Sequence, residues 1–452
     1  MKENQPETQQ LNRSLNSRHI TMIAIGGAIG TGLFLGSGQA IHHAGPSIII
    51  AYLVMGIFTF MLMRALGELM LSDTSKHSFI DFVSTYMGPR MEFVTGWMYW
   101  ICWISLAMAD LTATGIYLKF WFPHLPQWVG PLIIVLLLML ANMVSVGIFG
   151  EIESWFSLVK VAAIIALILI GLGMVFNHHV VNGVPASFNN LVAYGGLFPT
   201  GRSGFMMGCQ MVVFAFAGIE MVGVTAGEAA NPEKELPHAI NTLPIRIALF
   251  YIGSMLVIMS VYPWNLIKTN TSPFVQVFTA VGIKYAAGII NFVVLTAAMS
   301  ATNSAIFTTS RTLYTLASTG NAPHYFAKLS SEAVPKRAVN FSSMVLLIVV
   351  ALNYFVPSKI FNIISSVSTI NFLFIWIIIL WCHILYRKKN PAGVKIFTMP
   401  GYPVTSWLTL LFFVGVLVVL LIEPSTRLSL ILFLVFFAIL FWQYKLITGK
   451  DR

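Results

Sequence analysis

Charged residues are scarce in this chain of 452 residues. Asp, Glu, Lys and Arg make up 9% of it, whereas hydrophobic residues make up 57%, and the mean hydropathy is +0.81. A chain of this length with so little polar surface cannot cover a water-soluble globule. The sequence therefore predicts a protein that crosses the membrane several times.

Signatures of catalysis and cofactor binding are missing as well. The three cysteines, Cys102, Cys209 and Cys382, are widely spaced inside apolar stretches, so they indicate neither a disulfide framework nor a metal site. Gly30-Thr31-Gly32 lacks the third glycine of a dinucleotide fingerprint, and no phosphate-loop lysine follows. No nucleophile stands in a pattern with a base. We expect no enzyme activity, no metal, no cofactor and no nucleic-acid partner.

Long apolar stretches are what the sequence has in abundance. A helical span needs about 20 apolar residues, and the chain contains twelve such stretches. We expect a cytoplasmic tail at 1–19, a core of ten spans at 20–385, a cytoplasmic loop at 386–403, two peripheral or dimer-forming spans at 404–447 and a cytoplasmic tail at 448–452. The twelve stretches are 20–40, 46–70, 93–122, 129–148, 154–177, 204–229, 243–266, 277–312, 338–356, 360–385, 404–422 and 428–447.

The net charge of +10 is explained by topology. With a cytoplasmic N-terminus, only six of the 26 Lys and Arg residues fall on the outer side, namely Lys119, Arg202, Lys268, Lys284, Lys359 and Arg427. An excess of basic residues in cytoplasmic loops is the positive-inside pattern. Both termini are then cytoplasmic.

The first stretch contains four glycines between Gly26 and Gly32. Such a run breaks a helix, and a broken backbone is tolerated in a membrane only where it faces protein or water. The amides from Gly30 onward would form a helix N-terminus, which attracts anions such as a carboxylate. Close helix packing through small residues is the alternative explanation.

The sixth stretch repeats this combination. It runs Phe214-Ala215-Phe216-Ala217-Gly218-Ile219-Glu220, followed by Gly223, Gly227 and Glu228. Interrupted spans at corresponding positions of two five-span halves are typical of inverted-repeat transporters, which bind substrate between the two interruptions.

Five further residues carry charge in or near apolar stretches. Asp110 lies in the third stretch, where a carboxylate marks a transport pathway or is a hydrogen-bonded structural group. Lys160 has two possible roles: its ammonium group takes the place of a bound cation, or its side chain extends to the inner membrane interface. Glu153 lies one heptad earlier, and we interpret it as a carboxylate at a helix N-terminus. Arg64 and Glu68 have the spacing of a local surface ion pair.

Several long motifs resemble those of a known family. GGAIGTGLFLGSG, TGWMYWICW, FGEIESWFSLVK, FAFAGIEMVGVTAGEAANPEKELPHAIN and NSAIFTTSRTLYTLA together are similar to the amino acid transporter branch of the amino acid–polyamine–organocation permeases. Within that branch, the Ala-Met-Ala-Asp run ending at Asp110 and GEAANPEKELPHAINTLPIRI most resemble bacterial D-serine/D-alanine/glycine permeases.

The resemblance implies an all-α membrane protein with twelve transmembrane helices, a five-plus-five inverted repeat of the LeuT type and discontinuous helices 1 and 6. It implies proton-coupled uptake at the bacterial inner membrane. The substrate carboxylate would bind Ala28, Ile29, Gly30, Thr31 and Gly32, and the amino group the carbonyls of Phe214, Ala215, Phe216 and Ala217, beside Gly218. Lys160, Glu220, Asp110 and Glu228 would serve proton coupling, with Lys160 in place of a structural sodium ion.

We therefore expect a symporter for small neutral amino acids, with D-serine, D-alanine and glycine as substrates beside L-alanine or L-serine. A permease for threonine, another neutral or an aromatic amino acid, and an amino acid exchanger, are the alternatives within the class. A channel or a nutrient receptor on the same fold is the alternative outside it. A homodimer is compatible with all of these.

Overall fold

The computed structural model describes residues 29–76, 78–144, 146–221, 231–282, 285–331, 333–357 and 359–448. Within them, nine helices are long and apolar enough to cross a membrane. They run Gly36–Ser72, Pro89–Leu118, Glu153–Phe176, Pro232–Val261, Ala286–Ser318, Lys336–Phe355, Ile360–Lys389, Val404–Ile422 and Arg427–Lys445. The protein is thus a multi-pass helical membrane protein, as its composition predicts.

The N-terminal third begins with a short helix, α2 (Thr31–Phe34), and continues through α3 (Gly36–Ala44), a 3-10 turn (Gly45–Ser47) and α4 (Ile48–Ser72). A small amphipathic helix, α5 (Phe79–Met87), starts with a capping box. The Ser78 hydroxyl accepts a bond from the Ile80 N–H, and the Asp81 carboxylate accepts one from the Ser78 N–H. Then come α6 (Pro89–Leu118), α7 (Val129–Asn142) and α8 (Val146–Phe176).

A short hairpin follows α8: β1 (Val180–Val181) pairs antiparallel with β2 (Val184–Pro185). After a 3-10 turn (Phe188–Leu191), α9 (Gly201–Phe216) leads into the sixth predicted stretch. The next span is composite, made of α11 (Pro232–Asn241), α12 (Leu243–Arg246), a π-helical segment (Ile247–Gly253) and α13 (Ser254–Val261).

A 3-10 turn (Trp264–Leu266) leads to α14 (Pro273–Ala280) and α15 (Ala286–Ser318). The single span predicted over 277–312 is therefore wrong, because two helices share that stretch. Gly282 and Tyr285 between them have positive φ angles of 75° and 72°, which ends a right-handed helix. Past a 3-10 turn (His324–Ala327), the chain continues with α16 (Lys336–Phe355) and α17 (Ile360–Lys389), then α18 (Val404–Ile422), a 3-10 turn (Pro424–Thr426) and α19 (Arg427–Thr448).

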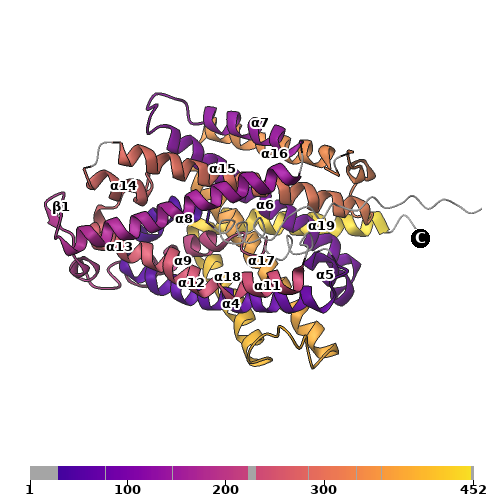
Figure 1. Ribbon diagram of the computed structural model, residues 1–452. Helices are drawn as coiled ribbons and strands as arrows, with labels where there is room; N and C mark the ends of the chain where they lie inside the picture. Colours follow the sequence, from indigo (N-terminus) through magenta and orange to yellow (C-terminus); the bar gives the residue numbers. More distant parts are fainter. Residues whose placement is uncertain are drawn as a thin grey trace, which may run out of the picture.

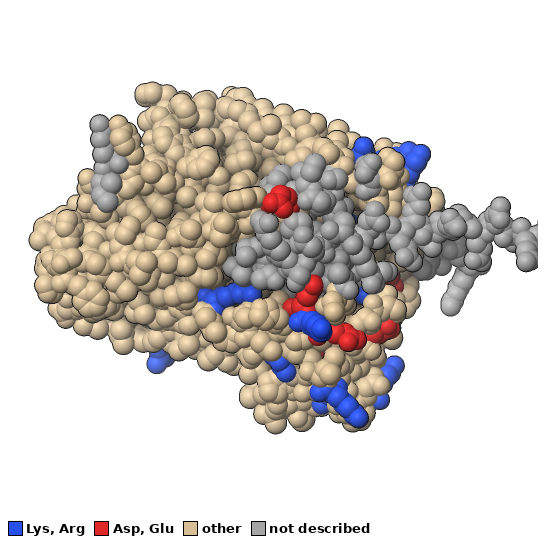
Figure 2. Space-filling view, in the orientation of Figure 1, with Lys and Arg blue, Asp and Glu red and all other residues tan. Residues whose placement is uncertain are grey.

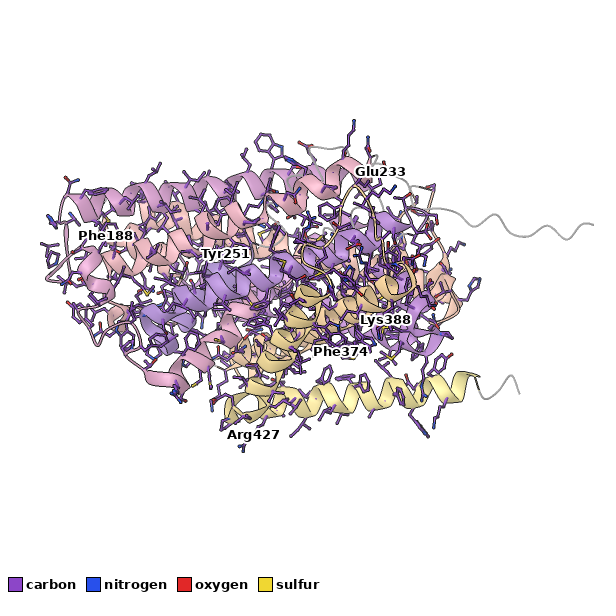
Figure 3. The ribbon with its side chains drawn as sticks, turned by 90° about the horizontal axis from the view of Figure 1, so that it is seen from below. Phe188, Glu233, Tyr251, Phe374, Lys388 and Arg427 are labelled. Carbon is purple, nitrogen blue, oxygen red and sulfur yellow. The ribbon has the colours of Figure 1, made fainter. Side chains whose placement is uncertain are left out.

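Two long helices, α6 and α15, form the centre of the bundle (Figure 1). In the most apolar part of each helix, 78% of the α6 residues and 83% of the α15 residues are buried, whereas only 28% of those in α18 and 11% of those in α19 are. Figure 3 shows α19 running along the outside of the bundle, with Arg427 at one end. The last two helices are peripheral, as their uniformly apolar sequences predict.

Charged side chains are unevenly distributed over the visible face. Figure 2 shows Lys, Arg, Asp and Glu gathered toward the end that carries α5, and none around the β1 hairpin at the other end. In Figure 3, Glu233 and Lys388 lie toward one end of the long helices and Phe188 toward the other. This asymmetry is the one that the positive-inside rule associates with a cytoplasmic side.

Candidate functional site

The first described helix begins directly after a glycine. Gly30 is the N-cap of α2 and has an extended backbone. The first N–H groups of a helix have no acceptor inside the helix, and here Leu33 is the first to find one, donating to the Gly30 carbonyl at 3.2 Å. The amides before Leu33 therefore form the positive end of the helix, as predicted from the glycine run.

A buried carboxylate already caps this helix end. Thr31 donates to Asp110 Oδ1 from its hydroxyl at 2.6 Å and from its backbone N–H at 3.4 Å. Asp110 is fully buried, and its Oδ2 has no hydrogen-bond partner among the residues that the structure describes. A Cβ built on Gly30 would lie 3.7 Å from Asp110 Oδ1 and 3.5 Å from Ala301 Cβ of α15. Asp110 thus lies at the anion-binding end of α2.

The start of α2 and the end of α9, which lie within the two predicted interruptions, meet in space. A Cβ built on Gly32 would lie 2.6 Å from Ala215 Cα and 3.0 Å from the Phe214 carbonyl oxygen, so only glycine allows the two backbones to approach this closely. α9 ends at Phe216, and Gly218 follows with a φ of 89°. Residues nearly half the chain apart are therefore neighbours at one point of the bundle.

The carbonyls at the end of α9 are partly engaged. The Ala215 carbonyl accepts a bond from the Tyr251 hydroxyl at 3.0 Å, and the Phe216 and Tyr251 rings stack at 4.9 Å. The Phe214 carbonyl accepts from the Ala217 N–H at 3.2 Å, and the Phe216 carbonyl from the Ile219 N–H at 3.3 Å. A carbonyl oxygen has two lone pairs, so each can accept one further bond.

Glu220 follows this turn and is fully buried. Its Oε2 accepts a bond from the Trp376 indole N–H of α17 at 3.1 Å, whereas its Oε1 has no partner. Ala28 and Glu228, the remaining predicted site residues at the two interruptions, lie outside the described residues. Their place in the site stays a prediction.

Lys160 lies in a buried cluster with Glu153 and Ser300. Its Nζ donates to Ser300 Oγ at 2.8 Å and lies 3.8 Å from Glu153 Oε1, and Ser300 Oγ donates to the same Glu153 oxygen at 2.6 Å. All three side chains are fully buried, so Lys160 does not extend to the interface. The sequence-based explanation of Glu153 as a helix-terminal carboxylate is wrong, because residue 153 lies within α8 and turns inward.

Ser300 also connects this cluster to the helix break. Its neighbour Ala301 is the α15 residue that faces Gly30. Consecutive residues of α15 therefore contact the two features: Ser300 bonds to the Lys160 cluster, and Ala301 packs against Gly30. Glu153 could have been identified from its heptad spacing to Lys160, which places both on one helix face; Ser300 and Trp376 carry no comparable signal.

The Arg64–Glu68 ion pair expected from the sequence does not form. Glu68 Oε1 accepts from Arg387 at 2.8 Å, and Glu68 Oε2 accepts from the Met399 N–H at 2.8 Å and lies 2.9 Å from His383 Nε2. Arg64 instead donates to the Thr398 carbonyl and to Asn241. Both side chains of α4 therefore hold the segment that connects α17 to α18.

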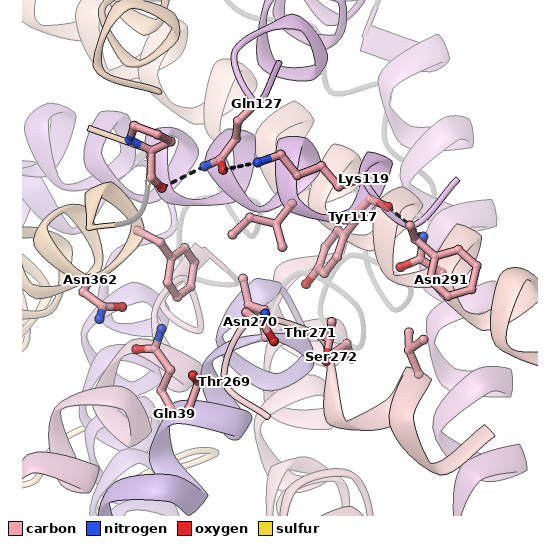
Figure 4. Close-up of a pocket in the computed structure, with 16 residues that line it drawn as sticks. Gln39, Tyr117, Lys119, Gln127, Thr269, Asn270, Thr271, Ser272, Asn291 and Asn362 are labelled. Atoms are coloured by element: carbon pink, nitrogen blue, oxygen red, sulfur yellow. Dashed lines mark hydrogen bonds between the residues drawn. The ribbon is translucent and has the colours of Figure 1, made fainter. Parts of the chain in front are cut away.

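A polar cavity of about 480 Å³ lies farther along the same helices (Figure 4). Gln39 of α3 and Tyr117 of α6 line it; they lie about 12 Å and 10 Å beyond Thr31 and Asp110 along their helices, at 1.5 Å per residue. Polar atoms without partners face this region, among them Tyr117 Oη and Ser272 Oγ. Phe361 lines the cavity and packs edge-on against Phe214 at 6.0 Å, so the cavity adjoins the break.

The part of the chain that the structure describes contains no group of three or more His, Cys, Asp or Glu side chains that could hold a metal ion. The buried ionisable groups near the start of α2 and the end of α9 are instead the separate carboxylates Asp110 and Glu220, with the Lys160–Glu153 pair of α8 close by. Buried ionisable residues in membrane helices mark transport pathways.

Comparison with known proteins decides the family. The amino acid permease family model matches residues 19–452. The chain belongs to the amino acid permease family. Over 100% of this chain and 98% of the relative, it is 53% identical to the amino-acid permease AapA of Bacillus subtilis. It is 55% identical to the transporter YdgF of the same organism, over 98% of this chain and 97% of the relative.

Another permease relative has a stated substrate range. The D-serine/D-alanine/glycine transporter of Escherichia coli K12 is 48% identical, over 99% of this chain and 96% of the relative. The resemblance found in the sequence motifs is therefore confirmed. The chain is an amino acid transporter of the membrane and not an enzyme.

Proposed function

We propose that this permease is a proton-coupled symporter that imports small neutral amino acids, namely D-serine, D-alanine and glycine, together with L-alanine or L-serine. We place it in the bacterial inner membrane with both termini cytoplasmic, twelve spans and a five-plus-five inverted repeat. For α18 and α19 the proposal keeps two options, contact with lipid and contact with a second copy in a homodimer, because their apolar faces are largely exposed.

The contact of the two helix interruptions carries the proposal. Gly30, Gly32 and Ala215 bring main-chain donors of α2 and main-chain acceptors of α9 together with almost no side-chain bulk between them. A helix N-terminus attracts a carboxylate and a helix C-terminus attracts an ammonium group. The two ends of a zwitterionic amino acid match these two helix ends, and main-chain recognition is compatible with a compact substrate of either hand.

Asp110 supplies a physical reason for coupling to a proton. A substrate carboxylate at the start of α2 would lie beside the Asp110 carboxylate, and two like charges at close range in a buried site disfavour each other. A proton on Asp110 removes that repulsion. Because Oδ2 has no partner, the proton can be taken up there without breaking the bonds from Thr31 to Oδ1. Proton and substrate would then bind together.

Lys160 and the other acidic residues support the same scheme. Lys160 is a buried fixed cation next to the helix break, and we assign it the place that a sodium ion takes in sodium-coupled transporters, so that no ion other than the proton is required. Glu220 and Glu228 complete the coupling set at the second interruption. The polar cavity beyond Phe214 and Phe361 is the proposed route from the outer face.

Uptake into proteoliposomes tests the proposal. The purified protein is assayed with labelled D-alanine, D-serine, glycine and L-alanine, with and without an inwardly directed proton gradient. We expect accumulation that collapses with the gradient. In Asp110→Asn, which keeps an oxygen facing Thr31 but cannot exchange a proton, we expect exchange of internal for external substrate to persist while gradient-driven accumulation is lost.

Each other outcome contradicts a definite part of the proposal. Accumulation that requires preloaded amino acid and ignores the gradient indicates an exchanger. Accumulation of threonine or an aromatic amino acid, with none of the small substrates, contradicts the small-substrate assignment. Unchanged gradient-driven uptake in Asp110→Asn moves the proton to another residue, and Lys160→Ala measured in parallel tests whether the buried cation is required.

A further inference from the structure

A second cavity, of about 570 Å³, lies at the opposite end of the bundle from the polar cavity of the transport route. Its walls are the end of α4, one face of α5, the last turn of α17 and residues 390–393. These elements lie at the end where basic side chains gather in Figure 2. None of the residues assigned to transport lines it.

Two lysines from distant parts of the chain, Lys76 and Lys389, line this cavity and approach the same aromatic ring. Lys76 Nζ lies 4.4 Å from the centre of the Phe82 ring and 6.0 Å from that of Tyr86, and Lys389 Nζ lies 5.4 Å from the same Tyr86 ring. Lys76 also donates to the Thr85 hydroxyl. In the described part of the chain, neither lysine has a carboxylate within salt-bridge distance. Two cations near one ring repel each other unless an anion lies between them.

The one carboxylate in the wall is already engaged. Asp73 Oδ1 accepts bonds from the Ser75 hydroxyl at 2.5 Å and from the Ser75 N–H at 3.1 Å. These hydrogen bonds hold the pKa of Asp73 below its ordinary value, so the carboxylate stays ionised and turned toward Ser75. The Asp73 charge also attracts Lys76, but among the described residues it forms no salt bridge with Lys76 or Lys389.

The position of the cavity indicates the source of the anion. α5 is amphipathic and buries Phe79, Ile80, Phe82 and Val83 against the bundle, as a helix lying in the membrane interface does. The last turn of α17 adds Lys388 beside Lys389, whereas Arg387 of the same turn is bonded to Glu68. Basic pockets between helices on the cytoplasmic side bind the headgroups of anionic lipids. Aromatic rings in the wall provide an apolar surface for the glycerol and upper acyl region.

We propose that this cavity is a binding site for an anionic phospholipid of the inner leaflet, whose phosphate lies between Lys76 and Lys389. The lipid would link α5 to the end of α17 and so stabilise the inner end of the bundle. The site is independent of the transport assignment, since it shares no residue with the helix interruptions.

Thermal unfolding of the full-length protein in a neutral detergent, after removal of native lipid, tests this site. Phosphatidylglycerol is titrated against phosphatidylcholine with the same acyl chains. We expect phosphatidylglycerol to raise the Tm saturably and phosphatidylcholine not to. Lys76→Gln/Lys389→Gln should weaken the apparent affinity roughly 25-fold, since each basic residue beside an anionic headgroup contributes about a factor of five.

Matched variants and soluble ligands make the result decisive. Lys336→Gln/Lys395→Gln removes the same charge from exposed positions outside the cavity and should leave the titration unchanged, and Lys76→Arg/Lys389→Arg should retain the response even where the glutamine pair folds poorly. An equal loss in both glutamine pairs contradicts a specific site. The absence of a phosphatidylglycerol effect overturns the proposal, and an equal Tm rise with inorganic phosphate or glycerol 3-phosphate overturns the lipid as its source.

Discussion

Glu68 and Asp110 are both fully buried carboxylates on long helices, yet their surroundings differ. Glu68 has partners on both oxygens, from two side chains and one backbone amide. Among the described residues, Asp110, Glu153 and Glu220 each have one carboxylate oxygen without a hydrogen-bond partner. A buried carboxylate whose oxygens are all paired is fixed in its charged form, whereas one with an unpaired oxygen can take up a proton without losing a bond. The difference separates a structural group from candidates for proton transfer.

The largest effect on folding should come from removing the structural carboxylate. In Glu68→Ala, the Arg387 guanidinium loses its only carboxylate partner among the described residues, and the Met399 amide loses its acceptor. Removal of one partner from a buried ion pair destabilises a protein by about 3–5 kcal/mol. We expect a clear fall in Tm in detergent. A change in Tm no larger than that of an exposed control, Glu151→Ala, would contradict the structural assignment.

A smaller effect is expected at the cluster beside the helix break. Ser300→Ala removes the hydroxyl that accepts from Lys160 and donates to Glu153, and leaves two buried charges 3.8 Å apart without a bridging group. Loss of a buried hydrogen bond to a charged group costs roughly 1.5–3 kcal/mol. The control is Ser310→Ala on the same helix, whose hydroxyl bonds only to the Phe307 carbonyl. Equal unfolding temperatures for the two variants would show that Ser300 does not support the cluster.

The smallest effect on folding is expected at Glu220. Glu220→Gln retains an oxygen to accept the Trp376 bond and removes the charge, so the unfolding free energy should change by less than about 1 kcal/mol. Uptake with and without a proton gradient is measured on the same preparation. If Asp110 carries the proton, this variant keeps a dependence on the gradient. A loss as complete as in Asp110→Asn would assign the proton to Glu220 instead.

Much of the architecture could be predicted from local sequence. Apolar stretches gave most of the long helices, because length and hydropathy are properties of a segment by itself. Gly30 and Gly218 predicted the start of α2 and the end of α9, because glycine weakens a helix through its own conformational freedom and needs no distant partner to do so. The division of the predicted span at 277–312 was missed, since Gly282 and Tyr285 interrupt a run that stays apolar throughout.

Contacts between distant segments could not be predicted in the same way. Arg64 and Glu68 have the spacing of a local ion pair, but His383, Arg387 and Met399 compete for Glu68 from the far end of the sequence. Glu153 was assigned to a helix end from its position just before an apolar stretch. Its buried partner, Ser300, comes from another helix and leaves no signal near residue 153. At both positions, a contact with a distant segment replaced the interaction that the neighbouring residues predict. The sequence around each position does not show which distant segment packs against it.

The close approach of Gly32 to Ala215 bears on how the substrate range of such a protein could be altered. A single methyl group at Gly32 has no space, so random mutagenesis at this contact would yield few working variants. Side chains of α6, α15 and α17 near the Gly32–Ala215 contact can change in size without separating the two backbones. Directed evolution toward a new amino acid would therefore begin on these three helices and leave the paired backbones untouched, since in the proposed binding mode the backbones hold the carboxylate and amino groups that all amino acids share.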